Sequence, residues 1–189
     1  MNKIYKVFPG GKFKVLTFSY DDGKIEDRRL VKLFNKYNLK ATFNLNTGII
    51  DPAIRIPQEE WPELYAGHDI AVHTFTHPTM IRLNDYAVIR EILEDKNNLE
   101  KIFHRPITGF AYPNGSFDSR IVDIAKSVGI KYARVTNDRY AATKAAENYA
   151  SSADGPIPIG DENGFFMPDD YMRWVPTCHH NHNLIDFGK

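Results

Sequence analysis

The stretch that decides the fold is LTFSYDDG, Leu16 to Gly23, in which Asp21 and Asp22 follow an apolar, β-prone run. Like charges in contact repel, so two adjacent carboxylates need a compensating partner. A metal ion or a role in proton transfer would supply that reason, whereas a solvated turn ending at Gly23 is the simpler alternative. On a turn backbone the two side chains point in different directions. One carboxylate can therefore bind a metal while the other faces a substrate.

The composition indicates one globular domain over residues 1–189, since 42% of the residues are hydrophobic and 13% are aromatic. Lys and Arg together number 24, as do Asp and Glu, and this balance argues against a nucleic-acid partner. The single cysteine, Cys178, rules out an intrachain disulfide and a metal cage built from several cysteines.

No membrane partner is expected, because no window approaches the roughly 20 apolar residues that a membrane span needs. The N-terminus, MNKIYKVFPGGKF, lacks the apolar core of a signal peptide. We therefore expect a soluble chain, cytoplasmic as written and extracellular if a leader has been removed.

The chain alternates short apolar runs with helical periodicity, which predicts βα units and a largely parallel sheet. The spacing of four apolar residues predicts one face of the first helix: Leu30, Leu33, Phe34 and Tyr37. Ligands of such α/β folds, open or barrel-like, bind at the carboxyl ends of the strands. Strands are predicted at 14–18, 40–45, 68–72, 107–112, 130–135 and 173–178, and helices at 30–37, 84–103, 118–129 and around 141–150.

Polar clusters follow four of the predicted strands, so they are expected to converge on one rim of the sheet. The clusters are Asp21 and Asp22, then His73 and His77, then Tyr112 to Ser116, and then His179, His180 and His182.

The histidines of VHTFTHP are spaced to suit a transition metal, and Pro78 is expected to place His77 at or just before a helix start. A nearby carboxylate would complete a three-ligand site, which is the pattern of a catalytic zinc. The carboxylate that does not bind metal could accept a proton from the metal-bound water. Ordinary polar residues near a helix cap are the alternative.

Two further clusters have chemical interpretations beside plain structural ones. YPNG could aim a backbone N–H at an oxyanion, or could be only a β-turn. The histidines of CHHNH could donate a general acid, add a metal ligand, or form a surface tail. Cys178 is expected to be a buried strand cysteine rather than a nucleophile.

TFSYDDG, HTFTHP and FAYPNGSFD resemble, in order and spacing, the first three motifs of the polysaccharide deacetylases (carbohydrate esterase family four, the NodB-homology domain). The resemblance covers Val15 to Arg134 and extends more weakly through RWVPTCHHNH. It implies an α/β fold, a distorted (β/α) barrel that we expect to be shortened at the C-terminus. It also implies a divalent metal, with zinc first and cobalt or nickel as alternatives. The implied partner is an acetylated carbohydrate.

The resemblance implies hydrolysis of an N-acetyl group, with O-acetyl as the second choice, at a bond that is not a peptide bond. Asp21 would be the general base, taking a proton from the metal-bound water as that water attacks. The metal would polarise the acetyl carbonyl and lower the pKa of its water. The implied metal ligands are Asp22, His73 and His77.

The remaining roles carry two departures from the family pattern. The oxyanion would lie between the metal and the backbone N–H of Asn114. In better-known members the third motif begins with an arginine that orients the base and carries a tyrosine before its glycine, whereas this chain has Ala111 and Asn114 there. We therefore expect either that the base is positioned differently or that activity on standard substrates is low.

The general acid that protonates the leaving amine is the second departure. Many relatives supply it from a strand near the end of the domain, after another helix, and this chain stops at Lys189, where that helix would begin. His179 is our assignment and His180 the alternative; otherwise the chain lacks that histidine.

Two other functions remain open at this point. The chain could be a metal- and carbohydrate-binding domain with weak or no turnover, or an amide hydrolase acting on a C–N bond outside sugars. A shortened barrel would also leave an open edge, which a homo-oligomer could cover.

Overall fold

The structure is a computed structural model that describes residues 8, 10–12, 15–136, 170–174 and 176. Its sheet confirms the predicted parallel arrangement, because each strand pairs in parallel with the next one along the chain. The strand order is β1 (Phe18–Asp21), β2 (Ala41–Leu45), β3 (Asp69–Val72), β4 (Gly109–Ala111) and β5 (Tyr132–Arg134).

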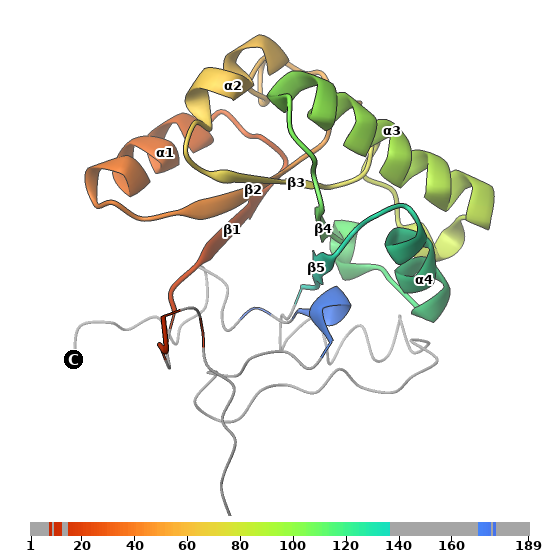
Figure 1. Ribbon diagram of the computed structural model, residues 1–189. Coiled ribbons are helices and arrows are strands. Elements are labelled where there is room, and N and C mark those ends of the chain that lie inside the picture. The colour runs from red at the N-terminus through yellow and green to blue at the C-terminus, as the bar shows by residue number, and fades with distance from the viewer. Residues whose placement is uncertain (1–7, 9, 13–14, 137–169, 175, 177–189) are drawn as a thin grey trace, which may run out of the picture.

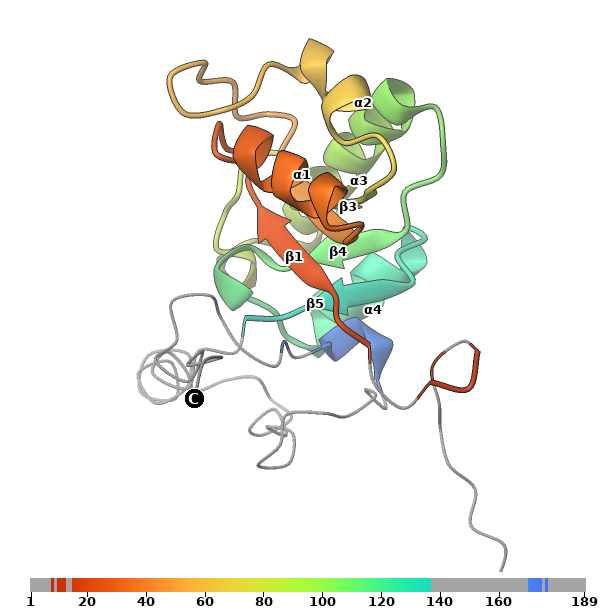
Figure 2. The ribbon, with the colours of Figure 1, turned by 90° about the vertical axis from the view of Figure 1, so that its left-hand side faces the viewer.

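Helices connect successive strands and form an arc around the outside of the sheet (Figure 1). Figure 2 shows the strands from the side of β1, with α1 lying along the outer face of that strand. The α-helices are α1 (Asp27–Lys36), α2 (Trp61–Leu64), α3 (Asp85–Phe103) and α4 (Ser119–Ser127). Short 3₁₀ segments are η1 (Gln58–Glu60), η2 (Met80–Arg82), η3 (Pro113–Gly115) and η4 (Tyr171–Arg173).

The middle strands are buried almost continuously, as expected for a parallel sheet that is covered by helices. All three residues of β4 are buried, and so are four of the five residues of β2. Strand β1 contains no fully buried residue, which fits its place at an edge of the sheet. The core therefore lies between β2, β3, β4 and the helices that cover them.

Capping residues mark the ends of α3 and α4, the two helices whose predicted bounds agree best with the structure. The Asn84 side chain accepts a hydrogen bond from the Ala87 N–H at the start of α3, and Asp118 accepts one from the Ile121 N–H at the start of α4. Gly129 adopts a positive φ of 89° just after α4, where a left-handed residue ends a helix. These boundaries agree with the predicted ones.

The apolar face predicted for the first helix is only partly buried. In α1 the buried residues are Asp27, Val31 and Phe34, whereas Leu33 and Tyr37 are 40% and 61% exposed. Asp27 is buried because its carboxylate accepts a 2.8 Å hydrogen bond from the Tyr65 hydroxyl. The helix thus turns a paired acid inward and leaves two hydrophobic side chains in solvent.

The first strand lies further along the chain than predicted, at Phe18–Asp21 instead of residues 14–18. Its partners determine its position, because Phe18 pairs with Ala41 and Asp21 with Asn44. Asp21 is consequently the last residue of the strand and not the first after it.

The last predicted strand, 173–178, is only partly testable. Trp174 forms one parallel bridge with Arg134 of β5, and the preceding residues form η4. Its remaining residues lie mostly outside the described ones, as does the predicted helix around 141–150. No helix in the described part of the chain combines the length and apolarity needed to cross a bilayer.

Candidate active site

Asp21 and Asp22 lie where β1 ends, and their carboxylates have different surroundings. Asp22 takes a left-handed backbone with φ 83°, which turns the chain sharply after the strand. Its N–H donates to the Asn44 carbonyl over 2.8 Å, and its own carbonyl accepts a hydrogen bond from Arg55 Nη1. This anchored turn leaves both carboxylates beside the His73 ring, with Asp21 Oδ2 3.9 Å and Asp22 Oδ1 3.8 Å from its Nε2.

His73 follows β3 directly, and its ring orientation is fixed by backbone contacts. The His73 N–H donates to the Leu45 carbonyl and to the Asp95 carboxylate. The ring nitrogen Nδ1 lies 2.8 Å from the Ala111 carbonyl, which can only accept, so Nδ1 carries the hydrogen. Nε2 therefore presents a lone pair to the site, as a metal-ligating histidine does. Burial lowers the pKa of His73, which keeps the ring neutral at neutral pH.

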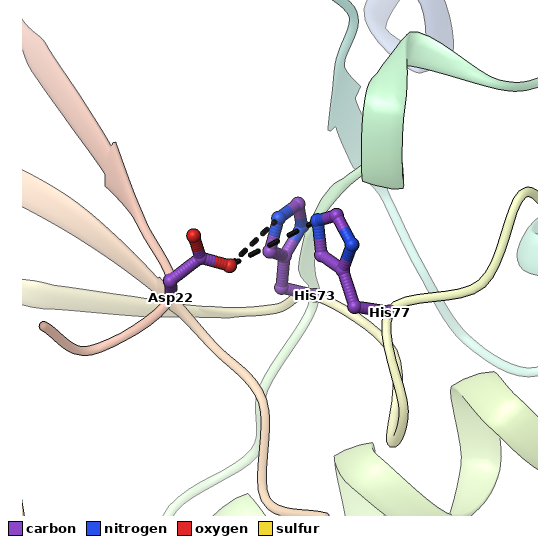
Figure 3. A group of neighbouring side chains, drawn as sticks. All are labelled: Asp22, His73 and His77. Atoms are coloured by element: carbon purple, nitrogen blue, oxygen red, sulfur yellow. Dashed lines mark ion pairs between the residues drawn. The ribbon is translucent and has the colours of Figure 1, made fainter. Parts of the chain in front are cut away.

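Asp22, His73 and His77 form a compact cluster whose side chains point toward one another (Figure 3). Asp22 Oδ1 lies 3.8 Å from Nε2 of His73 and 3.8 Å from Nε2 of His77. Ligand atoms around a tetrahedral zinc lie roughly 3.4 Å apart, given zinc–ligand bonds of about 2.0–2.2 Å. The spacing therefore suits a small divalent cation.

The chemistry of the donors also fits a cation. Asp22 Oδ1 is buried and has no hydrogen-bond partner among the described residues, although a buried carboxylate oxygen normally has one. The other oxygen lies 3.4 Å from Lys24 Nζ. A metal ion at the centre of the cluster would satisfy the oxygen that faces the histidines.

Backbone strain gathers in the loops that carry these motifs. Among the described residues other than glycine, positive φ values occur at Asp22, Asn38, Thr74, His77, His104 and Asn114. Four of these six belong to the three motif loops. Such residues cost free energy and persist where the surroundings hold them, which is common at functional sites. Here Asn46 donates to the carbonyls of His73 and Thr74, and the Thr74 hydroxyl accepts from the His77 N–H.

Pro78 does not begin a helix, contrary to our expectation. The next helical segment, η2, begins only at Met80. His77 therefore lies in a loop, where its backbone is left-handed. The prediction relied on the frequency of proline in first helical turns. That preference does not apply here, because the segment forms a strained loop.

Asp21 is held beside the cluster by donors from two other strands. Arg134 Nη2 donates to both carboxylate oxygens of Asp21, and Asn44 Nδ2 donates to Oδ1 over 2.8 Å. Oδ2 lies 3.9 Å from Nε2 of His73. Burial opposes ionisation of Asp21, but His73, Arg134 and Asn44 outweigh it, so the pKa of this carboxyl lies below its usual value. Asp21 is therefore an ionised carboxylate facing the cluster at neutral pH.

Sequence reasoning missed three residues that support the site: Arg134, Arg55 and Asp95. Asp95 of α3 is fully buried, and it accepts hydrogen bonds from the His73 N–H and from both the N–H and the hydroxyl of Thr47. The sequence did contain one indication of this role, because Asp95 is an acid that lies between Ile92 and Leu99 in the apolar stripe of α3. No signal marked the two arginines, since neither lies in a motif.

The other predicted site residues have a mixed outcome. Asn114 lies in η3 with φ 57°, after β4 and so at the same rim as the cluster. Its role as an oxyanion donor stays a prediction. His179, His180, His182 and Cys178 lie outside the described residues.

Comparison with known proteins gives the family. The family model described as polysaccharide deacetylase matches residues 9–133. Chitin deacetylase 1 of Cryptococcus neoformans var. grubii is 26% identical over 117 residues, which cover 61% of this chain and 24% of that protein. Chitin deacetylase 2 of the same organism is 23% identical over 190 residues, covering 88% of this chain and 40% of that protein.

A solved structure with the same fold is the Streptococcus pyogenes deacetylase PplD in complex with acetate. It has a TM-score of 0.64 and 25% identity, and the match covers 69% of this chain and 58% of that one. The curled parallel sheet with its outer helices confirms the predicted deacetylase (β/α) barrel fold. This chain spans half or less of the length of the curated relatives that it matches. On its family match, its fold and its motifs, the chain belongs to the polysaccharide deacetylase family.

Proposed function

We propose that this chain is a metal-dependent deacetylase that removes acetyl groups from a carbohydrate, preferring N-acetyl to O-acetyl groups. The observation that carries the proposal is the ionised Asp21 carboxylate, whose Oδ2 lies 3.9 Å from the ring of a member of the Asp22–His73–His77 cluster. A base next to a cation site is what hydrolysis by an activated water needs. The likeness to two chitin deacetylases supports an N-acetylated sugar as the substrate.

The metal would be held by Asp22, His73 and His77, with zinc as the first choice because imidazole and carboxylate ligands suit it. When bound, it supplies Lewis acidity for the acetyl carbonyl and for the attacking water. The alternatives cobalt and nickel accept the same ligands.

The chain's own residues carry the proton transfers. Asp21 takes one proton from the water whose oxygen attacks the acetyl carbon. The backbone N–H of Asn114 stabilises the charge that develops on the carbonyl oxygen. His179, or His180 in its place, donates a proton to the sugar nitrogen as the C–N bond breaks, so the products are acetate and an amine.

The test is acetate release from N-acetylglucosamine oligomers and from acetylated xylan. Chelator-treated protein is assayed alone, with zinc and with cobalt, beside the Asp21→Asn variant. We expect metal-dependent release from the oligomers and none from the variant, which should still bind zinc because Asp21 is not a ligand. Release that is unaffected by the chelator would contradict the metal role, and full activity of Asp21→Asn would contradict the base assignment.

A binding domain without turnover is the second candidate, favoured by the alanine at position 111, where an arginine is expected. It predicts that the zinc-loaded protein binds the oligomers in calorimetry and releases no acetate from any N- or O-acetylated substrate. Acetate release by the same preparation would exclude it.

A further inference from the structure

We propose that Arg134 is the positioning residue for Asp21, a role that the sequence motifs do not assign to it. The inference rests on the proposed function, in which Asp21 is the base. Arg134 is the last residue of β5, and its Nη2 donates to both oxygens of the Asp21 carboxylate, with 2.6 Å to Oδ2. Its side chain is only 17% exposed.

This contact depends on the curl of the sheet. β1 and β5 are the first and the last strands of the order, separated by β2, β3 and β4. In a flat sheet with strands about 4.8 Å apart they would lie about 19 Å from each other, beyond the reach of an arginine and an aspartate together. The carboxyl ends of β1 and β5 must therefore bend toward each other, and the Arg134–Asp21 pair closes the gap between them.

The neighbouring strand leaves room for this arginine. Ala111 of β4 is the register partner of Arg134, and paired residues present their side chains on the same face of a sheet. Ala111 is fully buried and offers only a methyl group. The alanine at the start of the third motif thus accommodates an arginine that arrives from the next strand.

The backbone around Arg134 is hydrogen-bonded on both sides, so the side chain that carries the guanidinium starts from a rigid backbone. Its carbonyl accepts from the Tyr112 N–H on the side of β4. On the other side, Trp174 donates to the Ala133 carbonyl and accepts from the Val135 N–H. A charged donor held in this way orients its carboxylate without having to reorganise.

Arg134 acts on Asp21 and not on the metal cluster. The cations near Asp22 are different ones, Lys24 at 3.4 Å and Arg55 at 3.5 Å. With Arg134 and Asn44 holding the carboxylate, Oδ2 of Asp21 stays turned toward His73. Removing Arg134 should therefore misplace the base while the three ligands keep their positions.

The test compares Arg134→Met and Arg134→Lys with Arg105→Met. Arg105 is a matched control, since it pairs with the Asp69 carboxylate at the opposite ends of the strands. We expect Arg134→Met to lower kcat for acetate release about 100-fold, as a misplaced catalytic group does. KM should stay within about threefold, and the bound zinc should be unchanged. Arg134→Lys should recover part of kcat, because a single nitrogen makes both contacts, and Arg105→Met should keep the wild-type value.

Wild-type kcat in Arg134→Met would overturn the proposal, and so would a loss of zinc equal to the loss of activity. If the wild type releases no acetate at all, the proposed function fails, and the pairing is then tested by unfolding. Asp21→Asn and Arg134→Met, alone and combined, are unfolded in urea. Their effects on the unfolding equilibrium constant should depart from additivity by about tenfold or more. Additive effects would refute the pairing by which Arg134 positions Asp21.

Discussion

Asp27 is a buried carboxylic acid at the start of α1, and its surroundings make the stability of the fold depend on pH. It is 3% exposed and hydrogen-bonded to the Tyr65 hydroxyl. Burial raises the pKa of Asp27 to about 7, although the hydrogen bond from Tyr65 opposes the shift. In the unfolded chain an aspartate has a pKa of about 3.9.

The sign of the pH effect follows from these two values. Between about pH 4 and pH 7 the folded chain holds a proton on Asp27 that the unfolded chain has lost. The contribution of Asp27 to the free energy of unfolding is therefore present at low pH and is lost as the pH rises toward 7. In the Asp27→Asn variant the side chain is neutral at every pH, so the free energy of unfolding does not fall in this way as the pH rises. Relative to the wild type, the variant should gain roughly 2–3 kcal/mol between pH 5 and pH 8.

The measurement is urea unfolding of chelator-treated wild type and Asp27→Asn at both pH values. Asp123→Asn, an exposed acid on α4, is the control and should follow the wild type. A difference between Asp27→Asn and the wild type that does not change with pH would contradict the prediction.

At the scale of residues, short motifs predicted the site only where its members are neighbours in the sequence. Asp21 and Asp22 are adjacent, and His73 and His77 are four apart, so their spacing is visible in one line of sequence. Arg134 is 113 residues from its partner Asp21. Nothing local distinguishes it from a surface arginine, because its function depends on how the sheet curls.

At the scale of elements, the position of strand β1 along the chain is determined by its pairing partners, and hydrophobicity alone did not predict it. The apolar residues Val15 and Leu16 predicted an earlier first strand, yet they are 48% and 68% exposed. The strand instead includes polar Ser19 and Asp21, whose side chains both accept hydrogen bonds from Asn44 of β2. Strand β1 was therefore predicted in kind and order, but its position came from side-chain contacts across the sheet.

Helix α3 supports the site through one buried acid, which gives a prediction about this element. Asp95→Ala would leave the N–H and the hydroxyl of Thr47 without their acceptor, and the His73 N–H with the Leu45 carbonyl alone. Unsatisfied buried donors are costly, so the free energy of unfolding should fall by roughly 3 kcal/mol. Because Asp95 holds the backbone of His73, a proposed metal ligand, zinc affinity should also fall roughly 10- to 100-fold.

Urea unfolding and zinc titration of the same variant measure both effects. Glu94→Ala is the matched control, since Glu94 is the preceding residue and forms a surface pair with Arg90. It should change stability by no more than about 0.5 kcal/mol. Wild-type zinc affinity in Asp95→Ala would show that α3 does not orient His73.

At the scale of the whole molecule, the sequence pattern predicted alternating strands and helices in a parallel sheet, and it left open whether the sheet is flat or barrel-like. Pattern and propensity describe each element separately, whereas curl is a property of the sheet. Only the resemblance of the three motifs to a known family supplied the barrel. The described fold brings the ends of β1, β3 and β5 to one site.

Because the proposed metal ligands come from the ends of β1 and β3, zinc should stabilise the whole described fold and not only one loop. A ligand that binds only the folded state raises the free energy of unfolding by about 2.7 kcal/mol at 100 times its Kd. For a chain of this size that gain corresponds to a rise in Tm of roughly 5–10 °C. Calorimetry of chelator-treated protein, before and after zinc is added, measures the shift.

Two histidine variants assign the shift to the cluster. His77→Ala removes a proposed ligand whose Nε2 lies 3.8 Å from Asp22 Oδ1, so zinc should no longer raise the Tm of this variant. His104→Asn should keep the full shift, because His104 is an exposed residue at the end of α3 with a left-handed backbone that asparagine accepts. A zinc-dependent rise that persists in His77→Ala and disappears in His104→Asn would place the metal outside the cluster. The opposite pattern would tie the stability of the sheet to the three residues that the sequence motifs first indicated.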